Sequence, residues 1–121
     1  MLPLANRVHR GTDIRVVVKK GRRFNTMTSI TYLLSDFEQE NCQFGFICGK
    51  NVGGAVTRNL VVRRFRDCCG KYLKDDELRH LKVIFRIKPE AAQADFQRIE
   101  KDVGRAIRFA KTLQLSHRSG E

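Results

Sequence analysis

The chain is short of acidic residues relative to its basic content. It carries 13 Asp and Glu against 24 Lys and Arg, which gives a formal net charge of +11 over 121 residues. A charge this large on a short chain favours a polyanionic partner, either a nucleic acid or an anionic membrane. No apolar run reaches the roughly 18 residues of a membrane span, and the N-terminus lacks an apolar signal-peptide segment. We therefore expect a soluble, cytoplasmic protein that does not contact membranes.

Motifs of metal sites, nucleotide sites and catalytic sites are also missing. The 4 cysteines include no C-x-x-C pair, Cys68 and Cys69 are adjacent, and the 3 histidines are scattered, so we expect reduced thiols and no zinc site. The glycine pair at 53–54 is not followed by Lys-Ser/Thr, which argues against a phosphate-binding P-loop. We find no carboxylate cluster for two-metal hydrolysis and no histidine pair for acid–base chemistry, and we interpret residues 75–77 as a solvated loop. We predict no catalytic residue and no metal held by the chain.

The chain length and composition predict one domain over residues 1–121. A hydrophobic content of 41% is sufficient for one core, and neither an internal repeat nor an interdomain linker is present. We expect residues 1–11 to form an extended basic lead-in and residues 116–121 to form a flexible polar tail.

A basic helix after a glycine-containing turn, residues 49–69, is the most informative stretch. On an ideal helix Asn59, Arg63 and Arg66 lie within about 60° of one another, opposite an apolar stripe that contains Phe65. Arg58 lies at the edge of that stripe, and no carboxylate occurs between Asn41 and Arg66. Because guanidinium groups bind phosphate oxygens in a bidentate manner, this face favours RNA or DNA. The alternative is the solvated face of a purely structural helix.

Hydrophobic periodicity predicts the remaining elements. Alternating or β-branched residues predict strands, and a long 3.6-residue period with late basic residues predicts a C-terminal helix. The predicted strands are 26–34, 43–48 and 81–88, and the predicted helix is 90–113. We expect the first two strands to pair as a hairpin-like unit and a parallel pair to flank the basic helix. Residues 12–20 are ambiguous, because Asp13 and Gly21 suit a capped helix whereas the β-branched run between them suits a strand.

Residues 50–59 read Lys-x-x-Gly-x-Ala-Val-x-Arg-Asn, and this stretch resembles the signature of the protein subunit of bacterial ribonuclease P. The resemblance extends over nearly the whole chain, from residues 6–8 through 13–14 and 21–24 to the later strand and the terminal helix. It implies an α+β single-domain sandwich in the order α-β-β-β-α-β-α. It also implies a left-handed βαβ crossover, like the second domain of a small-subunit ribosomal protein, against the usual right-handed rule. Residues 12–20 would then be helical, and splitting the chain within residues 26–49 would supply the third strand.

The resemblance also implies a function. In that family the RNA subunit is the catalyst of an endonuclease, a hydrolase that removes the 5′ leader of precursor tRNA and leaves a 5′-phosphate. Mg²⁺ is held mainly by the RNA. The protein subunit binds the leader, stabilises the RNA electrostatically and is not catalytic alone. The expected partners are the catalytic RNA and precursor tRNA, with one protein per RNA.

Two groups of site residues follow from the resemblance. The expected contacts to the RNA subunit are made by Lys50, Arg58, Asn59, Arg63 and Arg66. A cleft between the first helix and the sheet is expected to hold the single-stranded leader and to be lined by Ile14, Val18 and Tyr32, with Lys19 and Arg22 beside the phosphates. Tyr32 is the aromatic candidate for stacking, with a half-buried structural role as the alternative.

The sequence departs from the family pattern at four positions. Leu60 and Val62 occupy positions that usually carry cations, and Arg64 is the neighbouring cation that could replace one of them. Ile14 and Val18 stand where the first helix usually has aromatic residues, and neither can stack on a base as an aromatic would. Two other classes of protein remain open: a ribosomal or structural RNA-binding protein of the same fold, and an autonomous nuclease. Co-purification with ribosomes would indicate the first, and cleavage without RNA the second.

Overall fold

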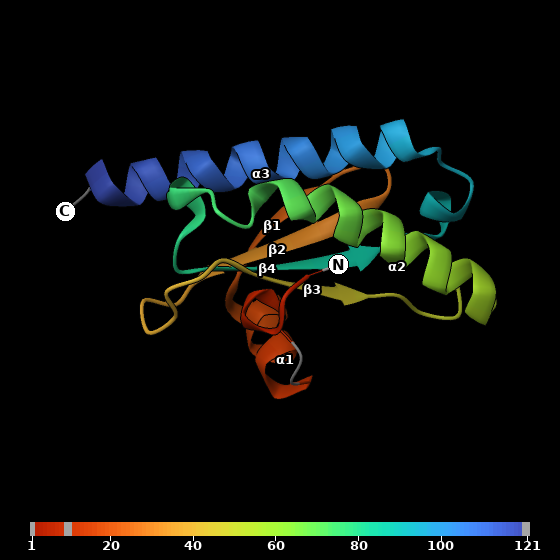
Figure 1. The fold of residues 1–121 in the computed structure, drawn as a ribbon, viewed down its shortest axis with the longest axis horizontal. Coiled ribbons are helices and arrows are strands. Elements are labelled where there is room, and N and C mark those ends of the chain that lie inside the picture. Colours follow the sequence, from red (N-terminus) through yellow and green to blue (C-terminus); the bar gives the residue numbers. More distant parts are fainter. Residues whose placement is uncertain (1, 9–10, 120–121) are drawn as a thin grey trace.

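A four-stranded sheet in the order β1-β2-β4-β3 forms the middle layer of the molecule (Figure 1). The computed structural model describes residues 2–8 and 11–119 of the chain. Its helices and strands are α1 (Gly11–Lys20), β1 (Arg22–Asn25), β2 (Ser29–Ser35), β3 (Gln43–Ile47), α2 (Ala55–Cys69), β4 (Leu81–Ile87) and α3 (Phe96–Ser119). This order confirms the expected α+β fold, α-β-β-β-α-β-α.

Two details of the predicted strand pairing are wrong. The hairpin is formed by β1 and β2, whereas β2 and β3 are separated by β4, which is antiparallel to β2 and parallel to β3. The additional strand therefore comes from residues 22–25, not from a division within 26–49. The reason lies in β4, where Val83, Ile84 and Phe85 are all fully buried. A strand that is apolar on both sides belongs in the centre of a sheet, and β2 and β3 have to lie on either side of it.

The β3-α2-β4 connection is a crossover between adjacent parallel strands, as expected. In Figure 1 both arrows point the same way, β3 lies below β4, and α2 returns in front of the sheet. This path is left-handed, as the resemblance implied and contrary to the general rule.

Residues 11–20 form helix α1, so the strand preference of the β-branched run does not prevail. Val17 is fully buried, and Ile14 and Val18 are half-buried on the same stripe of the helix. The stripe packs on the sheet, and this tertiary burial outweighs local propensity. Gly21 directly follows the helix. Glycine is required at this position, because a Cβ there would lie 2.5 Å from the Val17 carbonyl oxygen and 2.8 Å from the Leu33 carbonyl oxygen.

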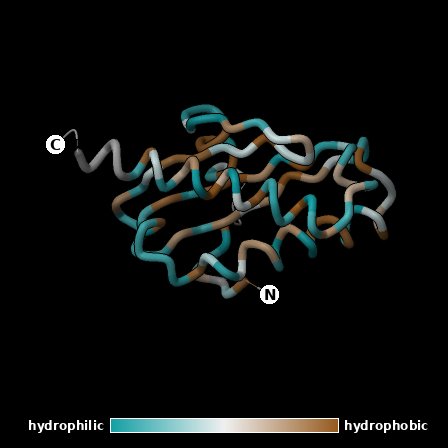
Figure 2. The backbone as a smooth tube through the Cα atoms, turned by 90° about the horizontal axis from the view of Figure 1, so that it is seen from above, coloured by the Kyte–Doolittle hydropathy of each residue, from teal (hydrophilic) through white to brown (hydrophobic). Residues whose placement is uncertain are grey.

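The sheet buries apolar side chains on both faces. Phe46, Phe65 and Phe85 pack together between the sheet and α2, in a core that also includes the inner side of α3. On the opposite face, Tyr32 and Ile84 pack against α1. Figure 2 shows the corresponding alternation of hydrophobic and hydrophilic residues along the helices.

Helix α3 differs in extent from the predicted helix 90–113. Residues Pro89–Ala92 form a separate 3₁₀ turn, and the α-helix then runs from Phe96 to Ser119. The helix thus includes most of the segment expected to be a flexible tail, and residues 120–121 lie outside the described part. The expected lead-in likewise contains a 3₁₀ turn, Leu4–Asn6, and Arg7 forms a bridge to Phe44.

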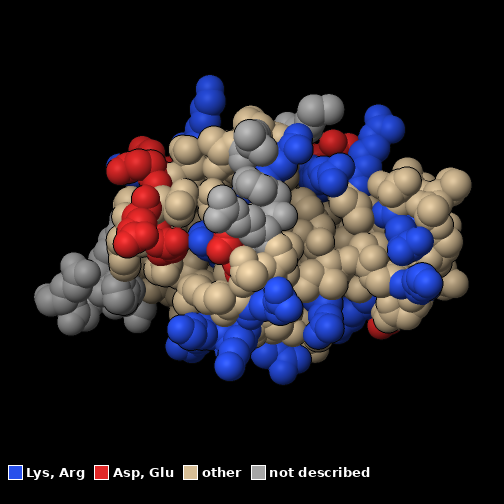
Figure 3. Space-filling view, turned by 90° about the horizontal axis from the view of Figure 1, so that it is seen from below, with Lys and Arg blue, Asp and Glu red and all other residues tan. Residues whose placement is uncertain are grey.

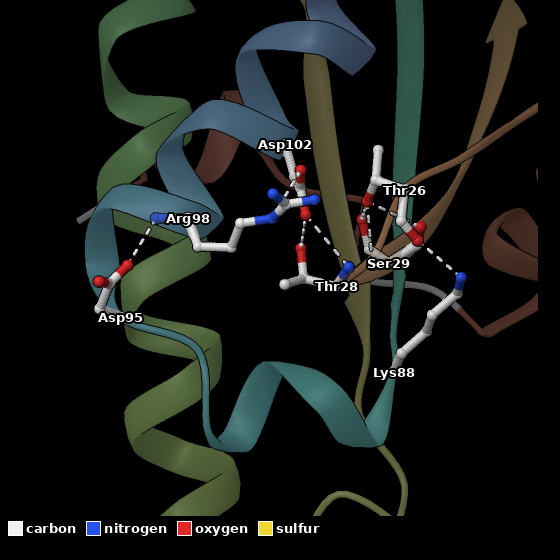
Figure 4. Close-up of polar contacts among 7 residues, drawn as sticks. All are labelled: Thr26, Thr28, Ser29, Lys88, Asp95, Arg98 and Asp102. Atoms are coloured by element: carbon white, nitrogen blue, oxygen red, sulfur yellow. Dashed lines mark hydrogen bonds and ion pairs between the residues drawn. The ribbon is translucent and has the colours of Figure 1, made fainter.

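A buried carboxylate joins α3 to the β1–β2 turn (Figure 4). Asp102 is fully buried, and its Oδ2 accepts hydrogen bonds from the backbone N–H and the hydroxyl of Thr28 at 3.1 and 2.7 Å. Its Oδ1 lies 3.4 Å from the Arg98 Nε, one helical turn earlier. A buried charge needs such partners, so Asp102 fixes the position of the hairpin against the helix.

Candidate nucleic-acid interface

A groove of ≈ 960 Å³ lies between α2, the edge strand β3 and the N-terminal segment. Its exposed lining side chains are polar or charged and come mainly from α2, whereas its buried and half-buried lining side chains are apolar. The polar or charged lining residues are Arg7, Arg58, Asn59, Arg63, Arg66 and Asp67, of which Arg58 is half-buried. The apolar lining residues include Leu2, Val8, Phe44, Phe46 and Val62. The groove therefore combines a mostly basic rim with an apolar floor.

The turn before α2 sets the direction of this helix. Gly53 has a φ of 154°, and a Cβ there would lie 2.9 Å from the Thr57 Cγ2, so glycine is required at this position. Gly54 is the extended N-cap residue, and its carbonyl accepts the first helical hydrogen bond from the Arg58 N–H at 2.9 Å. The helix then buries Val61 and Phe65 and turns its polar side toward the groove.

Four of the five residues expected to contact the RNA subunit, Arg58, Asn59, Arg63 and Arg66, line this groove. The fifth, Lys50, is exposed in the preceding loop and does not line it. The Nε of Arg58 is buried and has no hydrogen-bond partner in the described residues. The structure thus brings the α2 residues together, and their role in RNA binding stays a prediction.

Arg58, Arg63 and Arg66 are not neutralised by an ion pair within the described part of the chain. Arg63 and Arg66 form no ion pair there, and Asp67 is the one carboxylate among the lining residues. The Arg64 Nη1 donates to the Ala94 carbonyl at 3.2 Å, and its replacement of a missing cation stays a prediction. The Leu60 side chain is exposed and the Val62 side chain lines the groove. Of the two departures from the family pattern, Val62 therefore places apolar surface in the groove, and Leu60 places it on the exposed surface of α2 outside the lining.

The opposite end of the molecule is acidic and internally paired (Figure 3). Asp36 lies 3.1 Å from the Lys82 Nζ, and Asp75 lies 2.7 Å from the Lys111 Nζ. The lysine hydrogen bond is the main cause that lowers the pKa of each carboxyl group. Arg79 pairs with Glu40 at 2.7 Å. These cations have carboxylate partners, whereas Arg58, Arg63 and Arg66 have none among the residues that the structure describes.

The four cysteines are free thiols, as expected for a reduced protein. Burial raises the pKa of Cys42 to about 12 and that of Cys68 to about 11, and it also raises the pKa of Cys69. Cys48 lines the groove, where burial raises its pKa and the nearby Arg58 opposes the shift. Buried, protonated thiols are poor nucleophiles and poor metal ligands.

The residues expected to bind the leader lie on the α1 side of the sheet. Ile14, Val18 and Tyr32 belong to one apolar cluster, so the structure does bring them together. Direct packing of α1 on the sheet fills the space in which the cleft was expected. Tyr32 is only 4% exposed, and the Arg23 guanidinium lies 5.9 Å from its ring centroid. In this arrangement the ring offers no free face for stacking.

The strand register places Arg23, rather than Arg22, beside Tyr32. Arg22 pairs with Leu33, whose side chain belongs to the core on the α3 side, whereas Arg23 pairs with Tyr32. Because side chains alternate along a strand, Arg22 points away from the predicted leader site. Lys19 is exposed near the end of α1.

Sequence reasoning also missed Arg86, which lies on the same face of the sheet as Arg23. Arg86 is an exposed residue of β4 and pairs with Ile30 and Ile47, which both pack on the α1 side. Its place among the apolar residues at the end of β4 was a signal that a cation was being presented at the surface. The register needed to choose between Arg22 and Arg23 was not visible in the sequence.

Within the described residues, no helix is both long enough and apolar enough to cross a bilayer. The same part of the chain holds no group of three or more potential metal-ligating side chains.

Fold and surface together define a small basic α+β protein with an unpaired arginine surface. The model of the family Ribonuclease P matches residues 2–111, and the chain belongs to this family. It is 35% identical over 108 residues to the ribonuclease P protein component of Acidothermus cellulolyticus, covering 88% of this chain and 89% of that one. It is 33% identical to that of Clavibacter michiganensis subsp. michiganensis, covering 93% and 100%.

Solved structures show the same fold. The ribonuclease P protein of Staphylococcus aureus matches with a TM-score of 0.78 at 20% identity, over 88% of this chain and 95% of that chain. The ribonuclease P protein of Thermotoga maritima matches with a TM-score of 0.71 at 13% identity, over 88% and 96%. The resemblance seen in the sequence is thereby confirmed at the level of family and fold.

Proposed function

We propose that this chain is the RNA-binding protein subunit of ribonuclease P, the endonuclease that removes the 5′ leader from precursor tRNA. In this proposal the partner RNA performs the hydrolysis and leaves a 5′-phosphate on the tRNA. The protein acts in the cytoplasm, as one copy per RNA, and contributes binding rather than catalysis. Family membership supports the assignment.

The observation that carries the proposal is the arginine face of α2. Arg58, Arg63 and Arg66 line one groove and have no carboxylate partner in the described residues, although the chain has carboxylates elsewhere. Keeping like charges together costs free energy unless an anion joins them. Phosphate oxygens of the RNA subunit supply that anion, with Asn59 and Lys50 as further contacts.

The leader is proposed to bind on the α1 side of the sheet. Ile14, Val18 and Tyr32 supply an apolar surface there, and Lys19 lies at the end of the helix. The placement of Arg23 over Tyr32 favours Arg23 as the phosphate contact originally assigned to Arg22. Because Tyr32 is buried, the leader would contact the rim of this cluster unless α1 moves.

Mg²⁺ is proposed to be held by the partner RNA. A protein that brings cations to the RNA lowers the amount of Mg²⁺ that the RNA needs for folding and substrate binding. The protein contribution should therefore be greatest when Mg²⁺ is scarce.

The test is cleavage of precursor tRNA at low Mg²⁺ by a bacterial ribonuclease P RNA, with and without this protein. We expect cleavage at the mature 5′ end only when both are present. The protein without RNA serves as the control for an autonomous nuclease. Binding without rescue of cleavage would contradict the proposal and favour the ribosomal alternative.

A further inference from the structure

We propose that the groove beside α2 holds one unpaired base of the partner RNA against the ring of Phe46, while Arg58, Arg63 and Arg66 bind the flanking phosphates. This inference rests on the proposed function and deepens it. It names the feature of the RNA that is recognised: an unstacked nucleotide rather than the outside of a regular helix.

The first argument is the chemistry of the groove floor. A surface that bound only phosphates would need polar groups throughout, yet Phe44, Phe46 and Val62 line the groove. Phe46 is partly exposed there, and it stacks on Phe85 with ring centroids 5.9 Å apart and planes 13° apart. Its contact with Phe65, at 6.5 Å, is edge-on. A ring held in this way is an immobile platform, and unstacked bases bind by stacking on such aromatic side chains.

The second argument is access. β3 is the edge strand of the sheet, and within the described residues the N-terminal segment pairs with its backbone at Phe44, where the Val8 N–H donates to the Phe44 carbonyl at 2.9 Å. Within the described residues no strand pairs with the outer edge of β3 at Phe46. The groove volume of ≈ 960 Å³ lies within the range of about 300–1,000 Å³ that is usual for small-ligand sites, so one nucleotide fits.

The third argument is charge. Arg58, Arg63 and Arg66 line the α2 wall of the groove, and the buried Nε of Arg58 has no partner among the described residues. Asp67, one turn beyond Arg63, is the only carboxylate in the lining. The phosphates are therefore placed nearer to Arg58 and Arg63 than to the C-terminal end of the groove. A single nucleotide would place its base on the apolar floor and its phosphates against the arginines of α2, so it would be complementary to both surfaces of the groove.

A regular RNA duplex makes a different prediction. Its bases are paired and stacked, so it would contact the arginines and leave the floor of the groove empty. Affinity would then depend on the rim charges, and the identity of residue 46 would have no effect on binding.

The affinity test compares Phe46→Leu with Phe24→Leu. Phe24 is the matched control because it is also a half-buried strand phenylalanine, stacked on Phe109 at 4.9 Å, but it lies in β1 at the other edge of the sheet. Binding to a bacterial ribonuclease P RNA is measured by filter binding over a range of salt. We expect Phe46→Leu to weaken binding about tenfold with an unchanged salt slope, and Phe24→Leu to change it less than about twofold. Equal effects of the two substitutions would overturn the proposal.

A fluorescence test does not depend on the stability of the leucine variant. The chain contains no tryptophan, so Phe46→Trp introduces a single indole into the groove and Phe24→Trp a single indole outside it. We expect the RNA to quench the first and not the second. Heparin, which carries negative charge but no bases, should leave both unquenched. Failure of the RNA to quench Phe46→Trp, or equal quenching by heparin, would overturn the proposal.

Arg63→Gln separates this inference from the proposed function. That substitution should lower the salt slope by roughly one whether or not a base enters the groove. If Arg63→Gln lowers the salt slope as expected while Phe46→Leu leaves RNA affinity unchanged, base binding is refuted and the proposed function is not. Loss of both effects, with no rescue of cleavage, would refute the proposed function as well.

Discussion

The two ends of the molecule both carry arginine or lysine, but they use these cations differently. Along the groove side of α2, Arg58, Arg63 and Arg66 have no carboxylate partner in the described residues. Acidic side chains gather at the other end (Figure 3). There Lys82 and Lys111 each pair with an aspartate. The comparison shows that net charge alone does not locate an interface. We expect the interface where cations are left without a carboxylate partner.

The largest expected effect comes from removing the unpaired cations together. The triple variant Arg58→Ala, Arg63→Ala and Arg66→Ala should weaken binding to a ribonuclease P RNA about 100-fold and lower the salt slope by about two to three. The helix should persist, because its apolar side packs in the core. Filter binding over a range of salt measures the effect, and thermal melting controls for folding. An unchanged slope would remove the α2 face from the interface.

Asp102 extends the comparison to a carboxylate that is itself fully buried and whose partner Arg98 is partly exposed. Asp102→Ala removes both hydrogen bonds to Thr28 and leaves Arg98 without its partner, so we expect the free energy of unfolding to fall by about 2–4 kcal/mol. RNA affinity of the folded protein should not change. The control is Glu100→Ala, which breaks an exposed pair with Lys71 and should lower the free energy of unfolding much less, because water and salt screen that pair. Urea unfolding compares the two, and equal losses would contradict the role of burial.

The paired end should also respond to acid. The pKa of both Asp36 and Asp75 is lowered from 3.8 by a lysine partner, so each contributes stability above that value and loses it as the pH falls through the lower folded-state pKa. Asp75→Asn should flatten the acid limb of the curve of stability against pH. Urea midpoints measured from neutral pH to below 3.8 test this. If the double variant Asp36→Asn, Asp75→Asn still loses stability steeply in acid, other carboxylates cause that loss.

The smallest effect is expected from cations that already have partners. Arg79→Gln and Lys111→Gln should each change the RNA dissociation constant less than about twofold, because their charges are offset by Glu40 and Asp75. The same filter-binding assay provides the measurement, with Arg63→Gln as the positive control. A loss as large as that of Arg63→Gln would mean that RNA extends over the acidic end.

Several features of the fold could be predicted from local sequence. The amphipathic period of residues 55–69 and the glycines before them predicted α2 and grouped Asn59, Arg63 and Arg66, with Arg58 at the edge of the apolar stripe. All four residues line one groove. The pattern of α1 was ambiguous because β-branched residues favour strands, and its packing on the sheet decided the outcome. The first strand was missed because Arg22–Asn25 is short and has no continuous apolar side.

The candidate site depended more heavily on tertiary structure. Strand order placed β4 between β2 and β3, and the register of β1 turned Arg23 rather than Arg22 toward Tyr32. A shift of one residue reverses the direction of every side chain in a strand, and nothing in the sequence specifies that shift. Burial of Tyr32 likewise follows from how α1 docks on the sheet.

The sequence by itself determined the family, the α+β class and the arginine face of α2, because these depend on motif and helical period within one continuous segment. The tertiary structure decided which cations remain unpaired, which side of the sheet each strand residue faces, and that Phe46 lies at the floor of the same groove as Arg63. The physical reason is that ion pairs, strand register and grooves join residues that are distant in the chain. Their geometry exists only once the elements have packed.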